Sequence, residues 1–215
     1  MTSVAVIDYG MGNLRSVAKA LEHVAPGARV DVTAERARIL AADRVFFPGQ
    51  GAIGDAMAQI ERTGLAPVLR EAVAGKPFLG ICLGLQILLE HSEEDGGVDG
   101  LGVLPGRVRH FPADMVDPRS GVHLKVPHMG WNQVHQTGAH PLWRGIPQDS
   151  RFYFVHSYFL EPATQACATG TTQYGTTFIS AVGRDNVFAV QFHPEKSQHP
   201  GLRLLQNFME WDGRA

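Results

Sequence analysis

The chain has few cysteines, no long apolar run and no strong excess of charge. Its 215 residues include only Cys82 and Cys167 as cysteines, which is too few for a disulfide scaffold and is typical of a reducing cytoplasm. The stretch Met1–Asp8 has no basic segment, and its apolar run is too short for a signal peptide. No stretch approaches the roughly 20 apolar residues that cross a bilayer. We therefore expect a cytoplasmic protein without a membrane partner.

The charged residues also exclude several classes of partner and ligand. Lys and Arg number 19 against 21 Asp and Glu, a net charge of −2, and the basic residues are scattered, so we expect no nucleic-acid partner. None of the ten histidines forms an H-x-x-x-H pair, and the two cysteines form no C-x-x-C pair. No metal site is predicted. The Gly10-x-Gly12 loop has Arg15 where a dinucleotide fingerprint needs glycine, so it predicts no nucleotide cofactor.

Apolar patterns predict an α/β fold with a parallel sheet. With 44% hydrophobic residues, the chain suits one domain with a sizeable core. Strand and helix patterns alternate as far as residue 91, which predicts right-handed crossovers and helices on both faces of the sheet. The strands are expected at residues 4–7, 29–32, 44–47 and 77–81, and the helices at residues 14–24 (capped by Asn13), 33–40 (capped by Thr33), 52–62 and 67–74.

The second half of the chain shows a different pattern. Short strands without long helices predict an antiparallel extension of the sheet, with strands expected at residues 122–126, 131–135, 152–155 and 176–182. An exposed loop is expected over Arg109–Gly121. A closing helix is expected to pack on the sheet through Leu202, Leu205, Phe208 and Met209. The prediction is a single three-layer α/β/α domain with a mostly parallel central sheet and an antiparallel extension.

The stretch Pro77–Gln86 predicts a nucleophile. Gly80 and Gly84 flank Cys82 with the spacing of the G-x-S-x-G elbow, a strained strand-to-helix turn that needs small neighbours. Leu83 would begin the next helix, so the positive helix end lies beside the sulfur and the Leu83 N–H is free to meet an oxyanion. Gln86 follows one helical turn later. The alternative is a buried cysteine that packs at a strand end.

The stretch Val187–Glu195 supplies a base for this nucleophile. His193 and Glu195 lie two residues apart, so that in an extended chain a carboxylate can hold the imidazole through one nitrogen. Pro194 cannot donate to a sheet ladder, which places the pair at a strand end, where open α/β sheets build their sites. Cys82, His193 and Glu195 together form the cysteine version of the acyl-transfer triad. The loop Pro48–Gly51 either adds a backbone oxyanion donor or is a plain turn.

These motifs resemble those of the class I (triad-type) glutamine amidotransferases. The resemblance covers essentially the whole chain, as one amidotransferase domain over residues 1–215. Three further stretches are similar to the glutaminase subunits of imidazole glycerol phosphate synthases, enzymes of histidine biosynthesis. They are Ile7-Asp8-Tyr9-Gly10-Met11-Gly12-Asn13, Lys125-Val126-Pro127-His128-Met129-Gly130-Trp131-Asn132 and Tyr153-Phe154-Val155-His156-Ser157-Tyr158.

The resemblance implies roles for particular residues and no cofactor. Cys82 attacks the side-chain amide of L-glutamine and forms a thioester, His193 protonates the leaving ammonia, and Glu195 orients His193. The oxyanion residues implied are Gly49, Gln50 and Leu83, and the glutamine-binding residues implied are Gly51, Gln86, Glu94, Ser157 and Tyr158. Many relatives carry a small apolar residue where this chain has Gln50, which bears on the conformation of that loop.

The resemblance also implies a partner. Free ammonia near neutral pH is mostly ammonium, which has no lone pair for attack, so ammonia must reach an acceptor before bulk water. The implied partner is a (β/α)8-barrel cyclase subunit that forms a heterodimer with the chain, and the implied contact residues are Asn13, Pro127, His128, Met129, Gly130 and Trp131. Core packing is the alternative role for Met129 and Trp131.

Three other functions fit parts of the pattern. An amidotransferase subunit could feed another acceptor, as in anthranilate or aminodeoxychorismate synthase. A cysteine peptidase shares the elbow, but gives the Pro127–Asn132 stretch no role. A non-catalytic binding subunit could keep the fold, although the intact Cys82, His193 and Glu195 argue against it.

Overall fold

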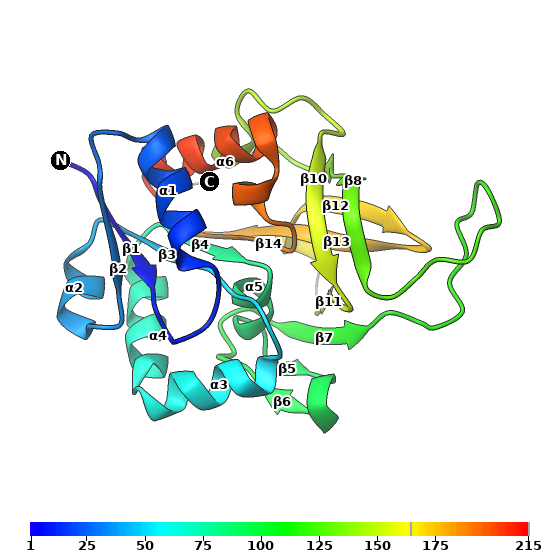
Figure 1. Ribbon diagram of the computed structural model, residues 1–215, viewed down its shortest axis with the longest axis horizontal. Helices are drawn as coiled ribbons and strands as arrows, with labels where there is room; N and C mark the ends of the chain where they lie inside the picture. The colour runs from blue at the N-terminus through cyan, green and yellow to red at the C-terminus, as the bar shows by residue number, and fades with distance from the viewer. Residues whose placement is uncertain (164, 215) are drawn as a thin grey trace.

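The structure is a computed structural model that describes residues 1–163 and 165–214. Figure 1 shows a twisted sheet through the middle of the molecule, with helices packed against it at one end and long strands at the other. The helices are α1 (Leu14–Val24), α2 (Arg36–Ala41), α3 (Ile53–Arg62), α4 (Leu65–Gly75), α5 (Leu83–Ile87) and α6 (Gln198–Glu210). Short 3₁₀ turns are η1 (Glu94–Gly96), η2 (Pro141–Trp143), η3 (Gln165–Cys167) and η4 (Pro194–Lys196).

The strands fall into a large sheet and a separate two-stranded sheet. In chain order they are β1 (Ser3–Ile7), β2 (Arg29–Thr33), β3 (Arg44–Phe47), β4 (Phe78–Ile81), β5 (His91–Ser92), β6 (Val98–Asp99), β7 (Gly106–His110), β8 (His128–Gln133), β9 (His135–Gln136), β10 (Arg151–His156), β11 (Tyr158–Pro162), β12 (Ala168–Tyr174), β13 (Thr176–Arg184) and β14 (Val187–Val190). Within the described chain, the large sheet runs in the order β2-β1-β3-β4-β14-β13-β11-β7-β5-β6, and β12 and β9 join beside β13.

The parallel half of the sheet is buried on both faces, as its continuous apolar strands predict. Strands β2, β1, β3, β4 and β14 pair in parallel. Along β1, Val4 and Val6 face the core shared with α1 and α6, whereas Ala5 and Ile7 face the core shared with α3 and α4. Figure 1 shows these helix pairs on opposite faces. The predicted three-layer architecture is confirmed.

The antiparallel extension begins immediately after the parallel half. Strand β13 pairs antiparallel with β14, and β11 and β7 continue the antiparallel order. Among the described strands, β8 and β10 pair only with each other, in register from His128 opposite His156 to Gln133 opposite Arg151. They lie next to β12 and β13 (Figure 1), where Asn132 Nδ2 of β8 donates to Gln173 O of β12. The antiparallel extension therefore has two parts: strands added to the large sheet, and the separate two-stranded sheet.

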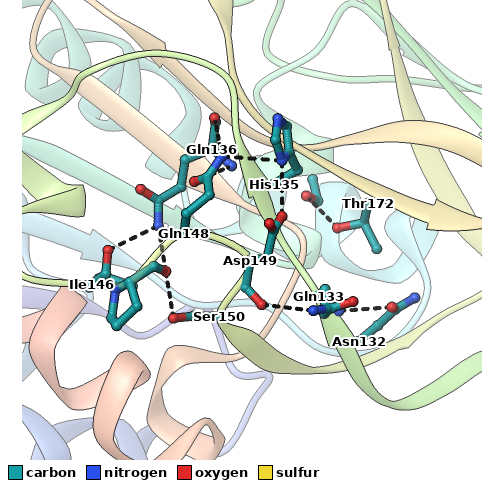
Figure 2. A network of polar contacts seen from close by, with 11 residues as sticks. Asn132, Gln133, His135, Gln136, Ile146, Gln148, Asp149, Ser150 and Thr172 are labelled. Carbon is teal, nitrogen blue, oxygen red and sulfur yellow. Dashed lines mark hydrogen bonds and ion pairs between the residues drawn. The ribbon is translucent and has the colours of Figure 1, made fainter.

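Polar side chains hold β9 against the turn that precedes β10. His135 Nδ1 lies 2.9 Å from Asp149 Oδ1, and Gln148 Nε2 donates to Gln136 O over 3.0 Å. Figure 2 shows this network, in which Gln133 Nε2 also donates to Asp149 O. Asp149 has a φ of +61°, a left-handed conformation in which aspartate is enriched several-fold among residues other than glycine.

Several details of the sequence prediction are wrong. Residues 122–126 do not form a strand, because Val122 is 62% exposed and the segment makes only a single bridge between Val116 and His123. The predicted exposed loop starts too early, since β7 runs to His110 and Phe111 is buried in an aromatic cluster. Thr33 belongs to β2, and its hydroxyl accepts from the Glu35 N–H before α2 begins. In the described residues, no helix is long and apolar enough to cross a membrane.

Candidate active site

The turn between β4 and α5 holds Cys82 in a strained conformation. Cys82 has φ 52° and ψ −110°, and its N–H donates to Val190 O of β14 over 2.7 Å. A Cβ on Gly84 would lie 2.1 Å from Phe47 O, and one on Gly80 would lie 3.1 Å from Gly84 O. The two glycines therefore let β3, β4 and α5 approach closely enough to form the elbow.

We expect Gly84→Ala to destabilise the fold by about 1–3 kcal/mol or more, because the added methyl group overlaps the Phe47 carbonyl. Urea unfolding measures the change. Gly75→Ala is the matched control, since it adds the same methyl group at an exposed helix end with no atom within 4 Å, and it is expected to be neutral or stabilising by up to about 1 kcal/mol. Equal midpoints for the two variants would contradict the close-packing argument.

His193 and Glu195 form a buried pair at the carboxyl end of β14. His193 Nδ1 lies 2.8 Å from Glu195 Oε1, and the two side chains are 2% and 3% exposed. The sequence suggested an extended chain between His193 and Glu195. This prediction is wrong, because the 3₁₀ turn η4 starts at Pro194. The His193 N–H donates to Tyr153 O, and Ser197 Oγ donates to His193 O over 2.6 Å. These bonds stabilise the conformation of the η4 turn, which positions the His193 and Glu195 side chains next to each other.

His193 follows β14, which pairs in parallel with β4, the strand that leads to Cys82. Burial alone would lower the pKa of His193, but the negative charge of Cys82, hydrogen bonding to Cys82 and the Glu195 carboxylate raise it to about 10. The imidazole Nε2 is buried. With Nδ1 bound to Glu195, Nε2 is the ring atom left to exchange a proton with Cys82 or a substrate.

Cys82 opens into a cavity of about 480 Å³, a size typical of small-molecule sites. Most of the residues predicted to bind glutamine or an oxyanion line this one cavity, although they come from distant parts of the chain. The lining residues are Gln50, Gly51, Cys82, Leu83, Gln86, Glu94, Pro127, Val155, His156, Ser157, Tyr158 and Lys196.

The loop after β3 lies directly on the elbow. Gly49 is buried, and a Cβ there would lie 2.6 Å from both Gly84 N and Leu83 Cβ. Gly51 has φ +96°, a conformation that favours glycine, and a Cβ there would lie 2.8 Å from Met11 Cε. Gln50, between them, is half-buried and lines the cavity. The loop therefore lies against Leu83 and Gly84, the first residues of α5 after Cys82.

Glu94 has a structural contact as well as a place in the cavity. Its Oε2 accepts from the Ile53 N–H over 3.0 Å, so the carboxylate caps α3. Burial raises the pKa of Glu94, and the bond from Ile53 opposes that rise. Its substitution would therefore affect α3 together with any bound ligand.

The residues predicted for the partner contact lie in different environments. Met129 and Trp131 are 62% and 41% exposed on β8, and Trp131 packs edge-on against Tyr153. Asn13 is exposed, and its side chain accepts from the Ser16 N–H as the predicted cap of α1. His128 is only 3% exposed, and its Nδ1 lies 2.9 Å from His156 Nε2. A partner on β8 would meet Met129 and Trp131 rather than the His128 side chain.

Sequence reasoning missed two residues near the nucleophile, Tyr9 and Gln191. Tyr9 is buried, and burial and the charge of Cys82 raise its pKa. Its position just after β1 was the available signal, because parallel strands end at the same edge of a sheet. Gln191 Nε2 donates to Cys82 Sγ over 3.4 Å. Its position two residues before His193 gave no such indication, since only the fold places that side chain on the sulfur.

Comparison with known proteins gives the same class as the elbow and the His193–Glu195 pair. The family model "Glutamine amidotransferase class-I" matches residues 5–211, so the chain belongs to this family. Its relatives include imidazole glycerol phosphate synthase subunit HisH of Aromatoleum aromaticum, 60% identical over 98% of this chain and 99% of the relative. HisH of Nitrosococcus oceani is 61% identical over 99% of both chains. Within class I, the chain belongs with these HisH subunits.

Solved structures with low sequence identity share the fold. A putative GMP synthase protein from Thermoplasma acidophilum has a TM-score of 0.73 and 16% identity, covering 98% of this chain and 93% of that one. A structure described as a glutamine amidotransferase has a TM-score of 0.70 and 16% identity, covering 97% of this chain and 99% of that one. These structures support the α/β architecture.

Proposed function

We propose that the chain hydrolyses L-glutamine to L-glutamate and passes the ammonia to the cyclase subunit of imidazole glycerol phosphate synthase, in histidine biosynthesis. The observation that carries the proposal is the parallel pairing of β4 with β14, because it brings the buried His193–Glu195 pair to the same sheet edge as Cys82 and its cavity of about 480 Å³. The relatives that share about 60% of the sequence are named as subunits of that synthase. The two cysteines fit our proposal that the protein works in the cytoplasm.

The proposed reaction uses the triad in two steps. Cys82 Sγ attacks the Cδ carbonyl of glutamine, and His193 Nε2 gives its proton to the nitrogen that leaves as ammonia. A γ-glutamyl thioester remains on Cys82. His193 then takes a proton from a water molecule that attacks the thioester, and glutamate leaves as the thiol is restored. Glu195 keeps the His193 ring in one orientation through Nδ1.

The loop after β3 and the start of α5 supply the oxyanion site in this proposal. The backbone N–H groups of Gln50 and Leu83 would donate to the oxygen of the tetrahedral intermediate, and Gly49 allows the loop to lie against the elbow. A backbone donor makes the unusual side chain of Gln50 compatible with the role. Gly51, Gln86, Glu94, Ser157 and Tyr158 would contact the rest of the substrate.

The partner of the proposal is a (β/α)8-barrel cyclase subunit that binds the β8 face. Met129 and Trp131 are among the few large apolar side chains that the described chain exposes, and they share this strand. Apolar and aromatic side chains on one exposed strand are typical anchors of protein interfaces. Asn13 and the Pro127–Gly130 backbone would lie at the edge of the same contact.

Ammonia release from glutamine, with and without the cyclase subunit, tests the proposed function. Low turnover of the isolated chain is expected to rise when the cyclase subunit carries its ligand, since binding energy can shift the oxyanion loop to a competent state. Glutamate is measured in one assay, and cyclase product formed from glutamine in another. A chain that neither releases ammonia nor supports the cyclase under any of these conditions would refute the proposal.

We expect Trp131→Ala to weaken binding of the cyclase subunit about 30-fold, as truncation of an aromatic interface anchor costs about 2 kcal/mol. Calorimetry with the purified cyclase subunit measures the dissociation constant. Val32→Ala is the matched control, because Val32 is also an exposed apolar residue. It lies on β2, an edge strand of the large sheet, whereas β8 belongs to the separate two-stranded sheet. Binding that is weakened equally by both variants, or by neither, would remove β8 from the interface.

A further inference from the structure

Gln191 occupies a fully buried position between the nucleophile and the base. Its side chain is 0% exposed, and its N–H donates to Ser180 O of β13 over 2.9 Å. The residue before it, Val190, accepts from the Cys82 N–H over 2.7 Å. Backbone bonds therefore tie Cys82 and Gln191 to the same strand end, so the relative position of their side chains is set by the sheet.

The amide of Gln191 makes two contacts with opposite roles. Its Nε2 donates to Cys82 Sγ over 3.4 Å, and its Oε1 accepts from Gln86 Nε2 over 3.1 Å. Both contacts are buried, where an unpaired amide would cost free energy. Rotating the amide by 180° would turn a carbonyl oxygen towards the sulfur and an NH₂ group towards the NH₂ of Gln86. The two neighbours therefore fix one orientation.

The donated hydrogen has a chemical consequence at the sulfur. A thiolate is a strong hydrogen-bond acceptor, whereas the sulfur of a thiol or a thioester is a weak one. Donation from Gln191 Nε2 therefore favours the nucleophilic form of Cys82 over its protonated and acylated forms. The amide carries no charge and no proton that it could transfer, so its effect is on the state and direction of the sulfur.

The accepted hydrogen has a consequence for the cavity. Gln86 Nε2 donates both to Gln191 Oε1 and to Tyr158 O, which is 3.3 Å away. Tyr158 O also accepts from His156 Nδ1 over 2.7 Å. With Nε2 held at the wall, Gln86 Oε1 is the atom of that amide left to accept from a ligand in the cavity that Gln86 lines.

We propose that Gln191 is a positioning residue that orients the Cys82 sulfur and the Gln86 amide through one buried side chain. The inference rests on the proposed glutaminase function, because that function makes glutamine the ligand that Gln86 contacts. The donor Nε2 and the acceptor Oε1 of the Gln191 amide have two separable effects. Loss of the donor slows attack by the sulfur, and loss of the acceptor loosens the binding of glutamine.

Two variants separate these effects. Gln191→Met keeps an unbranched side chain of similar volume but loses both contacts. Gln191→Glu keeps an oxygen for Gln86 but offers the sulfur a carboxylate in place of a donor. Thr172→Val is the control for lost stability. Thr172 is buried and donates to Ser180 Oγ, and the backbone oxygen of the same Ser180 accepts from the Gln191 N–H.

The first measurement is the rate of alkylation of Cys82 by iodoacetamide as a function of pH, with the modified peptide identified by mass spectrometry. We expect Gln191→Met to slow alkylation at pH 7 about tenfold, because the sulfur loses a buried hydrogen-bond donor. Gln191→Glu is expected to slow it further. Thr172→Val is expected to leave the profile in place, even though its melting temperature falls.

The second measurement is glutamine hydrolysis by the complex with the cyclase subunit. The KM for glutamine is expected to rise several-fold in Gln191→Met and to stay near the wild-type value in Gln191→Glu, while kcat falls in both. Unchanged alkylation and KM in folded Gln191→Met would overturn the proposal. If that variant does not fold, an unchanged profile in Gln191→Glu would overturn it. The alkylation result is independent of turnover, so it still reports on Gln191 if the proposed function fails.

Discussion

Replacing Cys82 with alanine is expected to reduce glutamine hydrolysis by about 10⁴- to 10⁶-fold, because no other group beside the cavity can form the thioester. The methyl group of alanine fits the space of the thiol, and the strained φ of 52° remains, so the fold is expected to survive. Glutamate formation by the complex with the cyclase subunit measures the loss. The same complex is expected to make its product at the wild-type rate when ammonium salts replace glutamine.

Cys167→Ala is the matched control for this experiment. Cys167 is the second cysteine of the chain and is also buried, at 8% exposure, but η3 lies away from the cavity lining. Its substitution is expected to leave glutamine hydrolysis within about twofold of the wild-type rate. Normal hydrolysis by Cys82→Ala would show that the nucleophile is another residue. Failure of the Cys82→Ala complex with ammonium would indicate a structural defect.

Replacing His193 with asparagine is expected to lower glutamine hydrolysis by about 10²- to 10⁴-fold, the range that general acid–base catalysis contributes. Asparagine keeps a polar group near Glu195 but cannot shuttle a proton between Cys82 and the leaving nitrogen. The measurement is single-turnover formation of ammonia and of the thioester. A variant that forms ammonia at the wild-type rate would exclude His193 as the acid of the reaction.

The raised pKa of His193 also predicts how stability depends on pH. Its folded value of about 10 lies above the ordinary value of 6.5, so the folded protein holds the proton more tightly than the unfolded chain. This stabilisation is fully present below pH 6.5 and is lost as the pH rises through 10. Cys82→Ala removes the charge that contributes most to the rise, so the pKa of His193 in an NMR titration is expected to fall. An unchanged pKa of His193 in Cys82→Ala would show that Cys82 does not raise it.

The parallel half of the fold and the triad could be predicted from the sequence because each depends on local patterns. Continuous apolar strands, the Asn13 cap and the glycines around Cys82 indicate elements whose conformation is set by neighbouring residues. The rule that parallel strands end at one edge of a sheet then predicts that Cys82 and His193 meet. In the structure β4 and β14 pair in parallel, so Cys82 and His193 follow neighbouring strand ends.

The parts that the sequence could not reveal depend on contacts between distant segments. Residues 122–126 look like a strand, but their pairing with residues 115–117 stops at one bridge, between His123 and Val116, and Val122 stays exposed. The resemblance implies His128 as a partner contact, yet its side chain is buried and lies within hydrogen-bond distance of His156 on the facing strand. Gln191 reads as an ordinary polar residue after a buried strand. Its role follows from the pairing of β4 with β14.

That pairing has a consequence for the synthesis of the protein. Strand β14 lies between β4 and β13, and the side chain that touches Cys82 belongs to a residue 109 positions further along the chain. A ribosome must complete nearly the whole polypeptide before the middle of the sheet can close, and until then an apolar edge of β4 has no neighbour. Nascent chains should therefore be unable to consume glutamine, and they should need protection from aggregation until the last segment emerges.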